Sequence, residues 1–132
     1  MDTNEHECRT QNLLYKEEVY CIVGAAMEVA NILGHGLLEK PYENALVIEL
    51  DKRNIPYKQQ VKYPVIYKNE VVGEYYADLL VFDSIIVEVK SKASVSAVDH
   101  AQVINYLRIS GNKLGLIINF NAPKLHWERV IL

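Results

Sequence analysis

Three ionisable residues lie in a stretch of the sequence that is otherwise strongly apolar. Asp78 is followed at once by Leu-Leu-Val-Phe, and Glu88 and Lys90 are set among isoleucine and valine. A charged side chain in apolar surroundings is costly unless it is paired or binds a metal ion. These three residues are therefore the first candidates for chemistry.

The spacing of the two acidic residues predicts that they face each other. If the flanking strands form a hairpin that is symmetric about Asp83, Asp78 lies opposite Glu88, and cross-strand neighbours have Cβ atoms about 4.5–5.5 Å apart. Two carboxylates that close repel unless a proton or a cation lies between them. Carboxylates, waters and phosphate oxygens are the ligands that Mg²⁺ prefers, so the pair predicts a divalent-metal site.

Lys90 follows Glu88 by two residues and therefore lies on the same face of the strand. An ammonium group there can orient a water molecule or neutralise charge on a reacting phosphate. An isolated Glu-X-Lys sequence is usually an exposed ion pair, but Asp78 at hairpin spacing and the apolar neighbours favour a functional site. A purely structural interpretation, in which the carboxylates serve stability alone, predicts no metal binding.

The elements that must position these residues follow from periodicity. Before and after the strongly apolar stretch, apolar residues recur at three- and four-residue steps, which indicates helices. Between these helices, apolar and polar residues alternate, which indicates strands. Pro64 lies inside the first strand and predicts an edge position, because proline cannot donate to a central ladder. We expect helices over 17–33, 38–53 and 97–109, and strands over 60–67, 71–82, 85–89, 114–120 and 125–132.

The whole chain of 132 residues is predicted to form one α/β domain with a mixed sheet, in the order α-α-β-β-β-α-β-β. Residues 1–16 form a polar N-terminal lead-in, and 17–132 form the domain. The formal net charge of −3 argues against a protein that coats nucleic acid by bulk electrostatics.

The sequence also predicts where the protein works. The longest nearly apolar run, residues 19–27, is too short to span a membrane, and no secretory signal opens the chain. Two cysteines, Cys8 and Cys21, suit neither a zinc site nor a disulfide framework. We therefore expect a cytoplasmic protein without a membrane partner.

Several separated motifs resemble one known family. Asp78, the run Glu88-Val89-Lys90, and Gln102 with Tyr106 one helical turn later resemble the PD-(D/E)XK nuclease superfamily in its RecB-like form, which has a Gln…Tyr motif. Residues 36–42, Gly-Leu-Leu-Glu-Lys-Pro-Tyr, resemble the naming motif of the GxxExxY family. The similarity runs from about residue 19 to residue 132, and it implies a restriction-endonuclease-like fold with a mixed β-sheet flanked by helices.

The resemblance also implies a role for each matching residue. Asp78, Glu88 and the backbone carbonyl of Val89 would ligate Mg²⁺ or Mn²⁺, and Lys90 would position the attacking water. Further roles fall to residues on the helices and beyond the Glu-X-Lys strand. Glu39 would hold a metal-bound water or a second ion, Gln102 and Tyr106 would organise the site or contact the nucleic-acid backbone, and Lys92 is a candidate phosphate contact.

One of these assignments stays open, because Glu28 and Glu43 are rivals of Glu39 for the acidic position on the helices. For either rival, the simpler interpretation is a solvated helix face.

The resulting hypothesis is a metal-dependent nuclease that hydrolyses phosphodiester bonds, with DNA favoured over RNA by the resemblance alone. The alternative is a non-catalytic nucleic-acid-binding or accessory subunit with a nuclease fold, since a chain this small carries no recognition module. A homodimer would suit a small nuclease that acts on duplex, and an accessory subunit would work within a larger repair or defence complex.

Overall fold

The computed structural model describes residues 13–132, so most of the predicted polar lead-in, residues 1–12, lies outside the described part. The elements follow the predicted order, with boundaries that differ from the expected ones by a few residues. They are the helices α2 (Lys16–Leu33), α3 (Glu39–Lys52) and α4 (Ala97–Ser110), and the strands β1 (Tyr57–Tyr67), β2 (Glu70–Val81), β3 (Ile85–Lys90), β4 (Leu114–Asn119) and β5 (His126–Ile131). Within this part of the chain, no helix has the length and apolar character that a membrane span requires.

The five strands form one mixed sheet in the order β1-β2-β3-β4-β5. All neighbouring strands are antiparallel except β3 and β4, which are parallel and are connected through α4. A parallel pair needs such a crossover connection, whereas antiparallel strands can be joined by tight turns. Pro64 lies on β1 at the edge of the sheet, as predicted.

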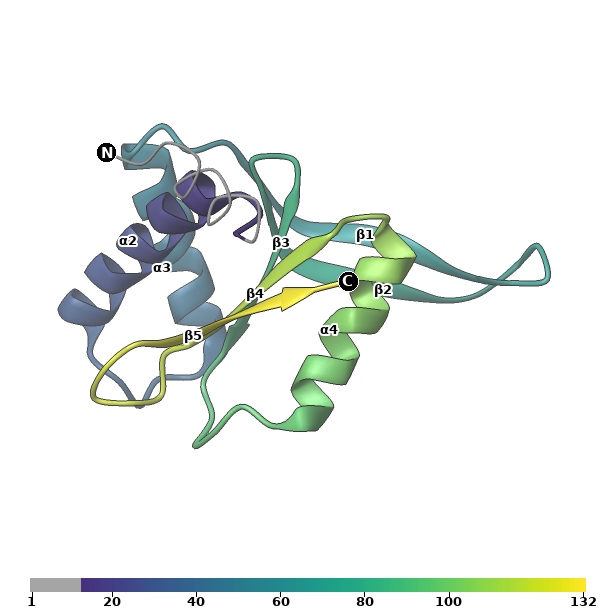
Figure 1. Cartoon of the computed structure of the whole chain (residues 1–132). Coiled ribbons are helices and arrows are strands. Elements are labelled where there is room, and N and C mark those ends of the chain that lie inside the picture. Colours follow the sequence, from purple (N-terminus) through teal and green to yellow (C-terminus); the bar gives the residue numbers. More distant parts are fainter. Residues whose placement is uncertain (1–12) are drawn as a thin grey trace, which may run out of the picture.

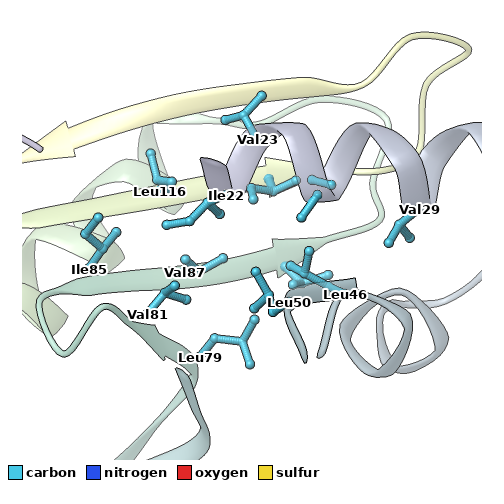
Figure 2. Packing of buried hydrophobic residues seen from close by; sticks show 14 of the residues in the cluster. Ile22, Val23, Val29, Leu46, Leu50, Leu79, Val81, Ile85, Val87 and Leu116 are labelled. Carbon is cyan, nitrogen blue, oxygen red and sulfur yellow. The ribbon is translucent and has the colours of Figure 1, made fainter. Parts of the chain in front are cut away.

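Helices cover the two faces of the sheet (Figure 1), and a hydrophobic cluster lies on each face. On one face, α2 and α3 pack against β3 and β4, and Figure 2 shows Ile22 and Leu46 of these helices pointing toward Val87 and Leu116 of the strands. On the other face, α4 packs Val103 and Leu107 against β2, β3 and β4. The restriction-endonuclease-like architecture expected from the sequence is confirmed.

The β1–β2 ribbon extends well beyond β3 (Figure 1). Where the ribbon meets β3, the side chains of β2 switch from one face of the sheet to the other. Ala77 and Leu79 are two residues apart, which in a regular strand places them on the same face. Ala77 nevertheless packs in the α4 cluster, and Leu79 packs in the cluster of α2 and α3. Opposite Asp78, Gln60 has a φ of 53°, a left-handed conformation that is uncommon outside glycine. The sheet is therefore irregular at the acidic candidate Asp78.

Candidate active site

Asp78 and Glu88 meet as the hairpin spacing predicts, and their carboxylates take the place of main-chain partners. The regular ladder of β2 and β3 ends at the pair Leu79–Val87, one step before the two acidic residues. Beyond it, the Asp78 N–H donates to Glu88 Oε2 at 3.1 Å, and the Val89 N–H donates to Asp78 Oδ2 at 2.9 Å. Each carboxylate thus accepts a main-chain N–H of the opposite strand where the regular ladder has ended.

Burial and mutual repulsion make these carboxylates costly to ionise. Glu88 is only 6% exposed, and Asp78 is half-buried. Burial raises the pKa of Glu88 to about 7, with a further contribution from the negative charge of Asp78. The pKa of Asp78 is raised by burial and also by the charge of Glu43. Such a pair is stabilised by a proton or by a cation.

Lys90 lies beside the pair, as predicted. In β3, Ile86 packs in the cluster under α4, whereas Val87 and Val89 pack on the opposite face, so Glu88 and Lys90 share the face of α4. The Lys90 side chain is half-buried. Its positive charge lowers the pKa of both carboxylates, although burial outweighs this effect.

A tyrosine that sequence reasoning did not single out completes this cluster. The buried Tyr75 hydroxyl donates to Glu88 Oε2 at 2.9 Å, and the Tyr75 ring stacks on the ring of Tyr106 with centroids 3.6 Å apart. Burial and the charge of Glu88 raise the pKa of Tyr75, so its hydroxyl stays a proton donor at neutral pH. Tyr106 is thereby brought to the site through Tyr75.

Glu43 of α3 is linked to the pair through a hydrogen-bonded side chain. It is 3% exposed, and its Oε2 accepts from Gln59 Nε2 at 2.7 Å and from Gln60 Nε2 at 2.9 Å. Gln60 also donates to Asp78 Oδ1 at 3.4 Å, which links the two carboxylates through one amide. The helix α3 therefore places an acidic group near the pair, separated from Asp78 by the Gln60 side chain.

Glu39 is placed differently. Its side chain is exposed, and its Oε1 accepts from the Ser91 N–H at 3.3 Å, just beyond β3. Tyr42, the last residue of the same motif, is fully buried and its hydroxyl donates to the Gly34 carbonyl at 2.7 Å. Gly36 has a φ of 105°, which only glycine adopts readily. The motif of residues 36–42 thus shapes the loop before α3 and fastens it to the end of β3.

Two further candidates, Lys92 and Gln102, make no hydrogen bond to Asp78 or Glu88 among the described residues. Lys92 Nζ contacts both carboxylate oxygens of Asp99, at 2.9 and 2.8 Å, and Asp99 in turn forms the capping box of α4 with Ser96. Lys92 therefore has a structural partner, which a phosphate would have to displace. Gln102 is exposed on α4, one turn before Tyr106.

The sequence of nearly the whole domain matches one known family. The model of the PD-(D/E)XK nuclease superfamily matches residues 16–130. The chain belongs to this superfamily. No curated protein matches the chain in sequence.

Solved structures resemble this PD-(D/E)XK chain at low sequence identity. The crystal structure of SSO0001 has a TM-score of 0.53 and 18% identity, covering 67% of this chain and 47% of SSO0001, so the chain spans about half the length of that protein. An alkaline exonuclease, LHK-Exo from Laribacter hongkongensis, has a TM-score of 0.40 and 10% identity, covering 80% of this chain and 75% of the exonuclease. The likeness to SSO0001 concerns the fold.

The side chains present fit the divalent ion that PD-(D/E)XK nucleases generally use. Within residues 13–132, no three His, Cys, Asp or Glu side chains are close enough together to form a complete ligand cage. Asp78 and Glu88 nonetheless supply hard oxygen donors, and burial raises the pKa of both carboxylates, a cost that a bound cation would offset. Mg²⁺ is commonly held by one or two carboxylates with waters and phosphate oxygens, so a complete protein cage is not required.

Sequence reasoning missed Tyr75 and Gln60 and left Glu43 unresolved. The available signal for Tyr75 was its position three residues before Asp78, but tyrosine is also common in strands for packing alone. Gln60 becomes notable only through its left-handed backbone. Periodicity does not separate Glu43 from Glu28 and Glu39, because it does not show which helix face meets the irregular ribbon.

Proposed function

We propose that this protein is a divalent-metal-dependent nuclease that hydrolyses phosphodiester bonds. The observation that carries the proposal is the direct contact of Asp78 and Glu88, whose pKa values are raised, beside Lys90 on the same strand face. The preference for DNA over RNA, and the assignment to the GxxExxY family and the RecB-like form, rest on the motifs at residues 36–42, Gln102 and Tyr106.

Asp78 and Glu88 would hold Mg²⁺ or Mn²⁺, with the Val89 carbonyl as a further ligand. The bound ion supplies Lewis-acid activation of water and neutralises phosphate charge. Lys90 extends from the same face as Glu88 and donates hydrogen bonds to the attacking water and to the phosphate oxygens as negative charge develops there. Glu43 replaces Glu39 as the acidic group of the helices, because it is buried and linked to Asp78 through Gln60.

The test combines metal binding with cleavage. Calorimetry with Mn²⁺ is expected to detect binding to the wild type and to Asp83→Asn, and none to Asp78→Asn. Asp83 is the matched control, because it is an exposed carboxylate at the turn of the same hairpin. Single-stranded, duplex and branched DNA and RNA are then incubated with Mg²⁺ or Mn²⁺, and Lys90→Ala is expected to bind the ion but to lose cleavage.

Undiminished metal-dependent cleavage by Asp78→Asn or Lys90→Ala would overturn the proposal. Binding of nucleic acid without cleavage of any substrate would favour a non-catalytic accessory subunit. A wild-type protein that binds no Mn²⁺ would leave the carboxylates with a structural role only.

A further inference from the structure

Glu88 is held by a hydroxyl that belongs to a stack of tyrosines. Two donors converge on one of its oxygens, Oε2, namely the Tyr75 hydroxyl at 2.9 Å and the Asp78 N–H at 3.1 Å. Neither hydrogen bond engages the other oxygen, Oε1. The orientation of this carboxylate, and with it the direction of Oε1, is therefore set by a side chain on β2 and by the backbone of β2.

The ring that carries this hydroxyl is itself fixed by two others. The Tyr75 ring stacks on Tyr106 of α4 with centroids 3.6 Å apart and an interplanar angle of 10°. Tyr63 of β1 lies 6.0 Å from the Tyr75 ring at 18°. Stacked aromatic pairs contribute about 0.5–1.5 kcal/mol beyond their burial. Tyr75 is only 7% exposed, so the stack links β1, β2 and α4 directly to Glu88.

We infer that Tyr75 is a positioning residue that orients the Glu88 carboxylate for the cation, and that Tyr106 acts through Tyr75. This inference rests on the proposed function. It assigns Tyr106 a role other than contact with the nucleic-acid backbone, since one face of its ring is already covered by Tyr75. Residues that orient a metal ligand typically change metal affinity about 10- to 100-fold when they are removed.

The test measures the Kd of Mn²⁺ by calorimetry for the metal-free chain of 132 residues. Tyr75→Phe keeps the ring and its stack but removes the hydroxyl, and its Kd is expected to rise about tenfold. Tyr76→Phe is the matched control. The neighbouring Tyr76 is 49% exposed, and its hydroxyl donates to Glu74 at 3.0 Å, so this variant also loses one hydrogen bond to a carboxylate. Its Kd is expected to stay at the wild-type value.

Tyr106 is tested by rescue. Tyr106→Leu removes the stacked ring and is expected to weaken Mn²⁺ binding, and Tyr106→Phe, which restores the ring, is expected to bind more tightly than Tyr106→Leu. An increase in KM for DNA in Tyr106→Leu with an unchanged Kd for Mn²⁺ would show that Tyr106 does not act through Tyr75. Urea unfolding of each variant shows that it is folded. If Tyr106→Leu does not fold, the comparison of Tyr75→Phe with Tyr76→Phe decides.

Equal affinities of Tyr75→Phe, Tyr76→Phe and wild type for Mn²⁺ would overturn the inference and leave the proposed function intact. A wild-type protein that binds no Mn²⁺ would overturn both. The two failures are therefore distinguishable in one set of titrations.

Discussion

At the residue scale, the two carboxylates of the site lower the stability of the metal-free protein. Glu88 is buried beside Asp78, and the pKa values of both carboxylates are raised in the folded state by burial and by neighbouring negative charge. Each ionised carboxylate therefore opposes folding until a cation binds. Residues that lower the stability of the fold are expected mainly at functional sites.

The first prediction concerns Glu88→Gln. The amide oxygen can still accept from the Tyr75 hydroxyl and the Asp78 N–H, while the negative charge is removed. We expect the metal-free variant to be more stable than wild type at pH 8, by about 1–3 kcal/mol, and to bind no Mn²⁺. Urea unfolding with and without Mn²⁺ measures both effects. A variant less stable than wild type at pH 8 would show that the charge is already compensated.

The second prediction is the pH dependence of the wild type. The pKa of Glu88 is raised from its ordinary value of 4.5 to about 7, so between these values the folded state holds a proton that the unfolded state has released. The free energy of unfolding must then fall as pH rises through this window. In the opposite direction, the pKa of Asp99 is lowered to about 2 by Lys92, so its contribution is lost only as pH falls below 3.8.

The metal-free protein is therefore expected to be more stable at pH 5 than at pH 8. Urea midpoints across this range measure the slope. Glu88→Gln serves as the control and should flatten it, and Mn²⁺ at pH 8 should restore stability in the wild type alone. A wild-type profile that rises from pH 5 to pH 8 without metal would contradict the prediction.

At the scale of elements, the packing of α4 on β4 depends on a glycine. A Cβ added at Gly115 would lie 2.7 Å from Val103 Cγ1, and Val103 is 1% exposed in the helix above. The branched valine has little rotamer freedom in a helix. Gly115→Ala is therefore expected to cost about 1–3 kcal/mol of unfolding free energy.

Two variants control this third prediction. Gly73→Ala adds the same methyl group in β2 where no atom of residues 13–132 lies within 4 Å, and it should leave stability nearly unchanged. Val103→Ala should recover part of the loss when it is combined with Gly115→Ala, because it removes the contacting methyl groups. Urea unfolding gives each value. Additive effects of the two substitutions would contradict the close contact.

The elements also show what the sequence could and could not predict. The order of helices and strands along the chain and the edge position of Pro64 follow from periodicity and from the chemistry of proline. The facing of Asp78 and Glu88 follows from hairpin spacing. By contrast, the sequence does not predict that Ala77 and Leu79 pack on opposite faces of the sheet. Alternation assumes a regular ladder of strand pairs, and the left-handed Gln60 opposite Asp78 interrupts that ladder. The role of Glu43 depends on the same irregularity and could not be separated from that of Glu39.

At the scale of the whole molecule, the charge distribution limits how nucleic acid can bind. The formal net charge is −3, and several basic side chains of the described residues are engaged by acidic neighbours. The ion pairs are Lys40–Glu43, Arg53–Glu49, Lys58–Asp83, Lys62–Glu74 and Lys92–Asp99. A bound cation between Asp78 and Glu88 would therefore be a principal attraction for phosphate.

The last prediction follows from this distribution. Lys90→Ala keeps both carboxylates and is expected to bind a duplex without cutting it, so its affinity can be measured by fluorescence anisotropy at several KCl concentrations. We expect binding to require Mn²⁺, and the slope of log K against log[KCl] to be no steeper than about −3, since each neutralised phosphate contributes about −0.9. Lys90→Ala combined with Asp78→Asn is the control without the ion. Metal-independent binding with a steep slope would contradict this prediction. It would mean that the basic side chains leave their acidic partners and bind the phosphates. The protein would then hold nucleic acid by its surface charge rather than through the centre at Asp78 and Glu88.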